Sequence, residues 1–286
     1  MKINNTFRHE HCPLCHSQRI LPLGKLNYSG TVKFCTSNIE LSDAPELWKC
    51  QQCLSRFVQY AVDAETAKTL YSTGQAEERW ATVAFEQSKT PDVVNSMVAI
   101  FKNRGKVLDV GCNTGELLDF ARGFGCETAG VEFSSASREI LIQKAHKAYA
   151  ALAESAEKYD VITAFDLVEH LYDVPNFLQQ CRERLTETGR LVILTGNMNS
   201  LSARLSKTCW WYAQYPEHIV FPTKKYFSDY SGFCIEIWQA TYASKGYKYP
   251  FYFGYLRCLE GVLRGRPYTG LPSIGSDHVL MVLKAT

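Results

Sequence analysis

The chain has 286 residues, 46% of them hydrophobic, which is enough to fill the core of one large domain or of one domain with a small appendage. A formal net charge of +2, without any run of like charges, does not favour binding to nucleic acid. No apolar run approaches the ~18 residues of a membrane span, and the N-terminus lacks the apolar centre of a signal peptide. Eleven cysteines, most of them in apolar segments, are typical of a reducing compartment. The sequence therefore predicts a soluble, cytoplasmic protein.

Two pairs of cysteines near the N-terminus stand apart from the others: Cys12 with Cys15, and Cys50 with Cys53. Each pair has the CxxC spacing that turns two sulfurs toward one ion, so together they predict a closed, structural zinc site in a module over residues 1–60. The pairs are further apart than in a common zinc ribbon, which leaves room for a hairpin or loop at about residues 24–45. A redox CxxC is the main alternative. The candidate substitute ligands are His11, His16 and Cys35.

The remaining chain changes in pattern twice. Residues 61–89 are rich in alanine, glutamate and glutamine and predict a helical connector or lid. Thr90 and Pro91 then start a helix, and the rest of the chain alternates strands with helices as in a parallel α/β sheet. Strands are expected at 127–131, 160–164, 191–195, 235–242 and 279–284, and helices at 135–147, 175–185 and about 224–230. With the strand before Gly111 these make six strands, and the pattern fits a seven-stranded α/β sheet that ends in a terminal hairpin pair, in a domain over residues 90–286.

An aromatic-rich segment at about residues 243–277 separates the last two expected strands. It is long for a hairpin loop, so it predicts a helical insertion over one end of the sheet. The insertion either packs on the main body or offers a surface to a substrate or a second chain.

The stretch from Val107 to Leu118 is an apolar run that breaks into a glycine turn and resumes with helical spacing. Gly111 and Gly115 allow a sharp turn and let a ligand approach the main chain, because neither carries a Cβ atom. A dinucleotide-binding GxGxxG motif would need glycine where this chain has Asn113 and Glu116. The stretch therefore indicates a nucleotide site that is not of the NAD type.

The segment from Asp109 to Gly115 resembles the DxGxGxG motif of class I S-adenosylmethionine (SAM) methyltransferases, with Asn113 in place of the middle glycine. The resemblance continues in Glu132, which ends the second expected strand and would accept hydrogen bonds from both ribose hydroxyls of SAM. It extends to Glu169 and His170 after the fourth strand. The resemblance implies a Rossmann-like sheet and these cofactor-binding residues: Asp109, Gly111, Asn113, Gly115, Glu132 and Asp166.

The order of a paired-CxxC module, a tyrosine-containing connector and a methyltransferase domain resembles C-methyltransferases that act on nucleotide-linked deoxysugars. The segment from Tyr215 to His218 is similar to the Tyr-x-Glu-His catalytic motif of that family. The chain is shorter than those enzymes, and we expect it to lack their C-terminal domain. The resemblance implies His218 as the first and His170 as the second choice of general base. It further implies that Tyr215 and Glu217 orient the substrate or the imidazole, and that Tyr71 reaches the site from the connector.

These patterns predict SAM-dependent methyl transfer to a small molecule such as a sugar, another carbohydrate or a secondary-metabolite precursor. One alternative is an RNA methyltransferase whose cysteine module binds RNA, supported by a mild excess of basic residues in that module. Another is a SAM-binding protein without catalysis, for which Asn113 is the only sequence sign. We therefore expect a small-molecule substrate and no membrane partner. The sequence does not indicate an oligomeric state.

Overall fold

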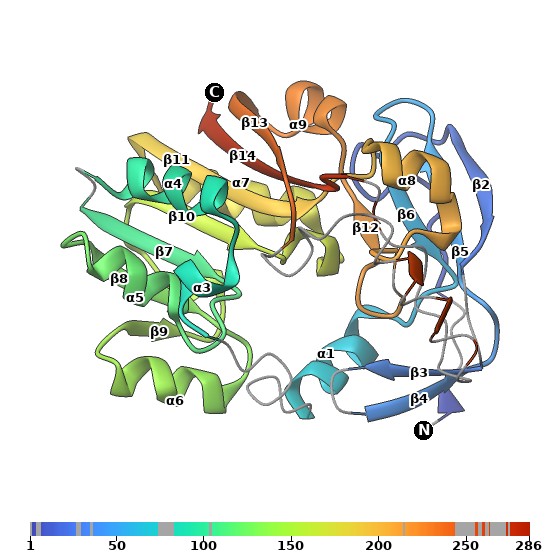
Figure 1. The fold of residues 1–286 in the computed structure, drawn as a ribbon, viewed down its shortest axis with the longest axis horizontal. Coiled ribbons are helices and arrows are strands. Elements are labelled where there is room, and N and C mark those ends of the chain that lie inside the picture. The colour runs from blue at the N-terminus through green and yellow to red at the C-terminus, as the bar shows by residue number, and fades with distance from the viewer. Residues whose placement is uncertain are drawn as a thin grey trace.

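The computed structural model describes residues 2–3, 7–26, 30–34, 37–73, 83–102, 105–213, 215–243, 255–256, 259–260, 263, 273 and 275–286. Figure 1 shows the C-terminal α/β sheet on one side of the molecule and the N-terminal strands on the other. No helix among the described residues is long and apolar enough to cross a membrane.

A seven-stranded sheet forms the larger part of the molecule, in the order β13-β14-β11-β10-β7-β8-β9. Its strands are β7 (Lys106–Val110), β8 (Glu127–Val131), β9 (Lys147–Tyr149), β10 (Tyr159–Phe165), β11 (Leu185–Gly196), β13 (Phe233–Thr241) and β14 (His278–Ala285). Only β14 runs antiparallel to its neighbours. The chain moves outward in opposite directions from β7 and β10, so ligands are expected beyond the carboxyl ends of these two strands. The predicted seven-stranded α/β fold is confirmed.

Alternate residues of each central strand face two different layers. Val161 and Val192 pack with the helices on one face, whereas Ile162 and Ile193 pack on the other. The first face is covered by α3 (Phe85–Ser88), α4 (Pro91–Phe101), α5 (Glu116–Arg122) and α6 (Ser135–Gln143). The second is covered by α7 (Val174–Arg184) and α9 (Lys224–Tyr230) and is continuous with the core of the N-terminal part. Because both faces are covered, the parallel strands are apolar almost throughout.

One helix boundary predicted from the sequence is wrong. The helix expected at 135–147 ends at Gln143, and Lys147 already begins β9. Ala145 has a positive φ of 62°, and His146 N–H bonds back to the carbonyl of Leu141, which closes the last helical turn. Glycine or asparagine usually occupies such a left-handed position, so the sequence carried no stop signal here.

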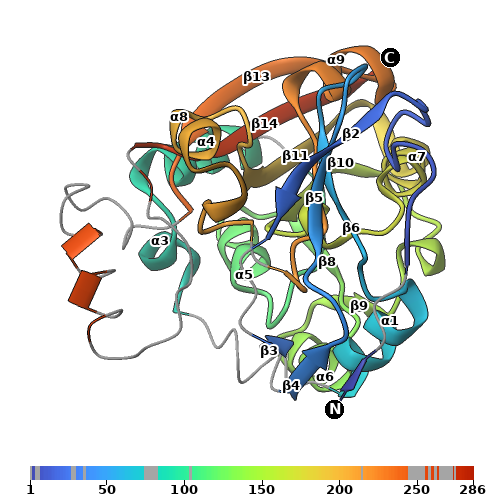
Figure 2. The ribbon, with the colours of Figure 1, turned by 90° about the vertical axis from the view of Figure 1, so that its right-hand side faces the viewer.

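The N-terminal residues form two small sheets. One has the order β1-β4-β3, from β1 (Lys2–Ile3), β3 (Thr31–Phe34) and β4 (Ser37–Leu41). The antiparallel β3 and β4 lie in the region where the sequence predicted an inserted hairpin. The other sheet has the order β12-β6-β5-β2, from β2 (Ile20–Lys25), β5 (Glu46–Cys50), β6 (Arg56–Gln59) and β12 (Val220–Phe221). The strands β5 and β6 face the viewer in Figure 2.

Strand β12 comes from the C-terminal half of the chain, yet it pairs with β6 of the N-terminal sheet, Val220 opposite Phe57. It follows His218 directly, and Figure 1 shows it between the two halves of the molecule. The N-terminal sheet is therefore completed by a strand of the other half.

The remaining elements connect these sheets. They are α1 (Ala64–Thr73), α8 (Leu201–Ser206) and the short 3₁₀ helices η1 (Leu152–Glu154), η2 (Val168–His170) and η3 (Lys207–Cys209). Helix α1 lies in the expected connector, of which residues 74–82 are outside the described residues. The expected insertion at 243–277 also lies mostly outside them.

Candidate functional site

The glycine turn lies between β7 and α5, at the carboxyl edge of the sheet. Gly111, Asn113 and Gly115 have positive φ values of 75°, 45° and 86°. A Cβ atom on Gly115 would lie only 2.6 Å from Cδ2 of Leu141. Both the backbone conformation and the close contact require glycine at this position, which brings the main chain to the surface of the site.

Glu132, at the end of β8, holds the turn from the neighbouring strand. Its Oε2 accepts a hydrogen bond from the backbone N of Asn113 at 3.0 Å, and its Oε1 accepts one from Ser134 N at 2.9 Å. The Oδ1 of Asn113 accepts a bond from Ser137 Oγ at 3.3 Å. The asparagine that replaces the middle glycine of the motif is therefore held by α6.

Asp109 lies beneath the turn and is 5% exposed. Its Oδ1 accepts a hydrogen bond from Thr163 Oγ1 at 2.6 Å, which connects β7 to β10. Burial, together with the negative charges of Glu116 and Glu132, raises the pKa of Asp109 to about 7. The carboxyl group therefore braces the base of the turn.

Asp166 follows β10 and has a positive φ of 50°. Its Oδ2 accepts a hydrogen bond from Lys89 Nζ at 2.7 Å, while its Oδ1 is buried and has no partner among the described residues. Burial alone would raise the pKa of Asp166, but the Lys89 ammonium and two nearby histidines hold it below its usual value. The result is an ionised carboxylate with one oxygen available to a hydrogen-bond donor.

Two histidines meet beside this carboxylate. His170 belongs to η2 and His218 precedes β12, and their ring centroids are 4.8 Å apart. His218 Nδ1 lies 2.6 Å from the carbonyl oxygen of Tyr212. Because a carbonyl only accepts, Nδ1 carries the proton and Nε2 keeps its lone pair. Burial, with the neighbouring His170, lowers the pKa of His218 to about 4, so its ring is neutral near pH 7.

Glu169 directly precedes His170 in the chain and is fully buried. Its Oε1 accepts a hydrogen bond from the hydroxyl of Tyr212, and its Oε2 accepts one from Thr195 Oγ1 at 2.8 Å. Burial raises the pKa of Glu169 above its usual value. The glutamate therefore fixes Tyr212 and the end of β11, and it does not face solvent.

Tyr71 of α1 lies beside one of the two histidines. The Tyr71 hydroxyl lies 3.2 Å from His170 Nδ1 and reaches it from α1. Tyr215 has a different contact, because its hydroxyl accepts a hydrogen bond from the backbone N of Val62, just before α1. Glu217 is half-buried next to His218. The Tyr215 side chain is therefore bonded to the backbone of the connector.

The four expected cysteines converge in the N-terminal part. Their sulfurs lie within 4.8 Å of one another, with Cys12 and Cys53 3.7 Å apart and Cys15 and Cys50 3.6 Å apart. Tetrahedral zinc with bonds of about 2.3 Å needs sulfurs about 3.8 Å apart, so the set fits zinc. His11 lies beside Gln18 instead, and Cys35 is outside the described residues.

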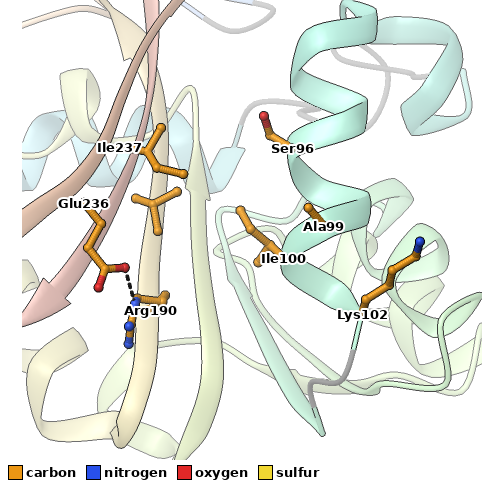
Figure 3. Close-up of a pocket in the computed structure, with 8 residues that line it drawn as sticks. Ser96, Ala99, Ile100, Lys102, Arg190, Glu236 and Ile237 are labelled. Atoms are coloured by element: carbon orange, nitrogen blue, oxygen red, sulfur yellow. Dashed lines mark hydrogen bonds and ion pairs between the residues drawn. The ribbon is translucent and has the colours of Figure 1, made fainter.

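A groove of about 560 Å³ lies between α4 and β13. Figure 3 shows side chains that line it, among them Arg190, which pairs with Glu236. Arg190 is level with Val161 on β10, near the amino end of that strand. The groove thus lies toward the edge of the sheet opposite the glycine turn. None of the candidate site residues lines it.

The comparison with protein families decides the class of this chain. A family model described as "Methyltransferase domain" matches residues 78–230, just over half of the 286 residues. The chain belongs to the methyltransferase-domain family. The expectation of a class I SAM-dependent methyltransferase domain is confirmed, since the family match covers the glycine turn, Glu132 and both site histidines.

Curated relatives of this family member include two ubiquinone biosynthesis O-methyltransferases. The protein from Bradyrhizobium diazoefficiens is 30% identical over 110 residues, covering 35% of this chain and 44% of the relative. The protein from Cereibacter sphaeroides is 31% identical over 109 residues, covering 34% and 43%. The chain therefore spans less than half the length of these curated relatives.

Among solved structures, the geranyl diphosphate C-methyltransferase from Streptomyces coelicolor A3(2) is similar to the chain with a TM-score of 0.51 and 15% sequence identity. The similarity covers 68% of this chain and 80% of that one. At this identity the likeness shows a shared fold.

Sequence reasoning missed two residues that the structure places at the site. Lys89 pairs with Asp166, and His278 stands at the start of β14. An antiparallel final strand begins at the edge where the parallel strands end. The predicted terminal hairpin pair was therefore the one sequence signal that could have located His278.

Proposed function

We propose that this chain is a SAM-dependent methyltransferase whose acceptor is a small molecule, such as a sugar, another carbohydrate or a secondary-metabolite precursor. The observation that carries the proposal is the position of His170 and His218 at the same sheet edge as the glycine turn. The turn follows β7 and His170 follows β10, and these strands are parallel neighbours. Because its lowered pKa keeps the His218 imidazole neutral near pH 7, the Nε2 lone pair is available to accept a proton.

The cofactor roles follow from the groups available at this edge. Glu132 presents two carboxylate oxygens beside the turn, which suits the two neighbouring hydroxyls of the SAM ribose. The buried Asp166 Oδ1 needs a donor, and the ammonium group of the methionine part of SAM is one. The residues present thus fit SAM through their chemistry.

Bound at this edge, SAM would supply an electrophilic methyl group, carried on a positively charged sulfur, for transfer to the acceptor. His218 Nε2 takes the proton that the acceptor atom loses. The Tyr212 carbonyl keeps the other proton of this ring on Nδ1, so that Nε2 is always the basic atom. Tyr71 and His170 bind the acceptor from the side of α1, and Glu217 orients the imidazole.

The sugar-type acceptor rests on the resemblance of the Tyr215–His218 motif and of Tyr71 to the deoxysugar C-methyltransferases. The names of the relatives also support a small molecule, since they act in ubiquinone biosynthesis. In the N-terminal part, four thiolates around zinc leave no open ligand position, so the ion would stabilise the fold and take no part in the reaction.

Glu169, His170 and His218 also offer ligand atoms within 4.8 Å of one another, a geometry that can hold a cation. We assign His218 to proton transfer, and Glu169 and His170 to supporting roles, because both Glu169 oxygens already accept hydrogen bonds. Adding Mg²⁺, Mn²⁺ or Zn²⁺ to the purified protein should leave turnover unchanged. A strict requirement for one of these added ions would overturn the assignment.

The decisive experiment has two stages. Calorimetry first measures binding of SAM and of its demethylated product, and a panel of sugar nucleotides and other metabolites is then screened for a mass gain of one methyl group. His218→Gln should lower turnover by about 100-fold or more while SAM affinity stays within about twofold, since a general base contributes 10²–10⁴. Glu132→Gln should weaken SAM binding itself, and exposed His11→Gln is the control. Absence of SAM binding by the wild-type protein would refute the proposal.

A further inference from the structure

Asp277, directly before β14, is a buried carboxylate with an unusual number of donors. It is 1% exposed, and its Oδ2 accepts hydrogen bonds from Trp210 Nε1 at 3.2 Å, Trp211 Nε1 at 2.7 Å and the hydroxyl of Ser273. Its Oδ1 lies 2.9 Å from His278 Nδ1. A buried charge costs several kcal/mol unless it is fully hydrogen-bonded, and these four donors meet that need.

The donors keep this carboxylate ionised. Burial alone would raise the pKa of Asp277, but hydrogen bonds, led by the one from His278, hold it below its usual value. The backbone is fixed as well, since Asn197 N donates to the Asp277 carbonyl at 2.7 Å at the end of β11. Asp277 is therefore a rigid anchor for the two indoles and the imidazole that surround it.

The anchored groups enclose Tyr212. Trp210 and Trp211 immediately precede it, and its ring centroid lies 4.5 Å from that of His278 in an edge-to-face arrangement. The ring also packs on Gly196 of β11, where an added Cβ atom would lie 2.3 Å from ring carbons. The backbone at Gly196 and the ring of His278 therefore restrict the orientation of the Tyr212 side chain.

Tyr212 in turn holds the proposed base. Its carbonyl accepts the Nδ1 proton of His218, its ring lies 4.2 Å from the His218 ring, and its hydroxyl donates to Glu169. The hydrogen bond that sets the tautomer of His218 and the packing of one side of its ring therefore come from Tyr212, which contacts both indoles and the His278 ring that Asp277 holds.

We propose that Asp277 is a positioning residue for methyl transfer, which fixes Tyr212 through the paired indoles and His278 and thereby aims Nε2 of His218 at the acceptor. The inference rests on the proposed role of His218. It adds a carboxylate 59 positions away in the chain to the machinery of the reaction. Asp277 does not touch the acceptor in this arrangement, so its effect is on geometry.

The test compares Asp277→Asn with Glu46→Gln in the full chain. Asparagine keeps the size of the side chain but removes the charge and one acceptor oxygen. Glu46 is a matched control, because its Oε2 also accepts from an indole, Trp48 Nε1 at 3.1 Å, in the N-terminal sheet and away from the histidines. Turnover, SAM affinity by calorimetry and thermal stability are measured for each variant.

Asp277→Asn should lower turnover about 10- to 100-fold, because a misplacement near 1 Å costs about that much, with SAM affinity within about twofold of wild type. Glu46→Gln should leave turnover unchanged. Equal effects of the two variants on turnover, or loss of SAM binding in Asp277→Asn, would overturn the proposal.

A second readout needs no acceptor. In protein labelled with ¹⁵N-histidine, the His218 signals, assigned by their absence in His218→Gln, should show a protonated Nδ1 and an unprotonated Nε2 in the wild type. Asp277→Asn should mix the two tautomers. An unchanged His218 spectrum in the variant would refute the positioning role even if no acceptor is found, whereas failure of wild-type SAM binding would refute the proposed function instead.

Discussion

Thr223 is the residue through which the cysteine module and the methyltransferase sheet can be uncoupled most cleanly. It follows β12, is 2% exposed, and its Oγ1 donates to the carbonyl of Cys53 at 2.6 Å. The same oxygen accepts from Tyr226 N at 3.3 Å and so caps α9. Its backbone N donates to Ser55 Oγ at 3.2 Å. One side chain thus binds a cysteine knuckle to a helix of the other half.

Thr223→Val keeps the shape of the side chain and removes the hydroxyl, with its hydrogen bonds to the Cys53 carbonyl and Tyr226 N and its longer one to Ser55 Oγ at 3.5 Å. A buried hydrogen bond contributes about 1 kcal/mol and a helix cap about 1 kcal/mol, and each lost partner leaves a buried polar group unpaired. We expect a loss of about 2–3 kcal/mol in the free energy of unfolding. For a chain of 286 residues this corresponds to a melting temperature lower by about 3–5 °C.

The assay is thermal unfolding followed by circular dichroism and tryptophan fluorescence, with zinc content measured in parallel. Thr66→Val is the control, because Thr66 Oγ1 makes only an exposed bond to Asp63 Oδ2 at 2.7 Å, worth less than about 0.5 kcal/mol. Both signals should shift together in Thr223→Val, because the two halves share β12. A shift no larger than that of the control, or two separate transitions in the wild type, would refute this account of the coupling.

Three further outcomes are expected. Since burial and His170 lower the pKa of His218 to about 4, turnover should be constant from pH 7 to about pH 5 and fall only as the base is protonated near pH 4; a fall centred at pH 6.5 would contradict this. Cys50→Ser should abolish zinc binding, lower the melting temperature and, because β12 follows His218, reduce turnover with SAM affinity kept. Full activity without zinc would argue against coupling of the cysteine site to His218 through the shared sheet. Gly115→Ala should cost about 2–4 kcal/mol and weaken SAM binding, measured by unfolding and calorimetry, since its Cβ would lie 2.6 Å from Leu141 Cδ2 at a positive φ; wild-type stability would show that the turn relaxes freely.

The shared strand β12 connects the cysteine module to the histidine site through backbone hydrogen bonds. Val58 N donates to the carbonyl of Ile219 at 2.8 Å, and Ile219 N donates to the carbonyl of Glu169 at 2.8 Å. Ile219, the residue after His218, is therefore held between strand β6 of the N-terminal sheet and the 3₁₀ helix η2 of the methyltransferase domain. An ion at the four cysteines would act on the histidine loop through hydrogen-bonded backbone.

The sequence by itself determined the features that depend on neighbouring residues. Apolar periodicity located the strands of the α/β sheet, and α9 at Lys224–Tyr230 has the bounds that were predicted. The glycine spacing located the turn at Gly111 and Gly115, and the CxxC spacing selected the four cysteines that converge. In each case the physical cause, whether backbone freedom, strand pleat or ligand spacing, acts within a few residues of chain.

Only the tertiary structure decided the surroundings of His218. The tautomer of its ring depends on Tyr212, whose position depends on Asp277, and its lowered pKa depends on burial beside His170. The addition of β12 to the N-terminal sheet joins Val220 to Phe57, which are far apart in the chain. Sequence periodicity contains no signal for such contacts, because desolvation and hydrogen bonding between distant segments arise only when the sheets have packed.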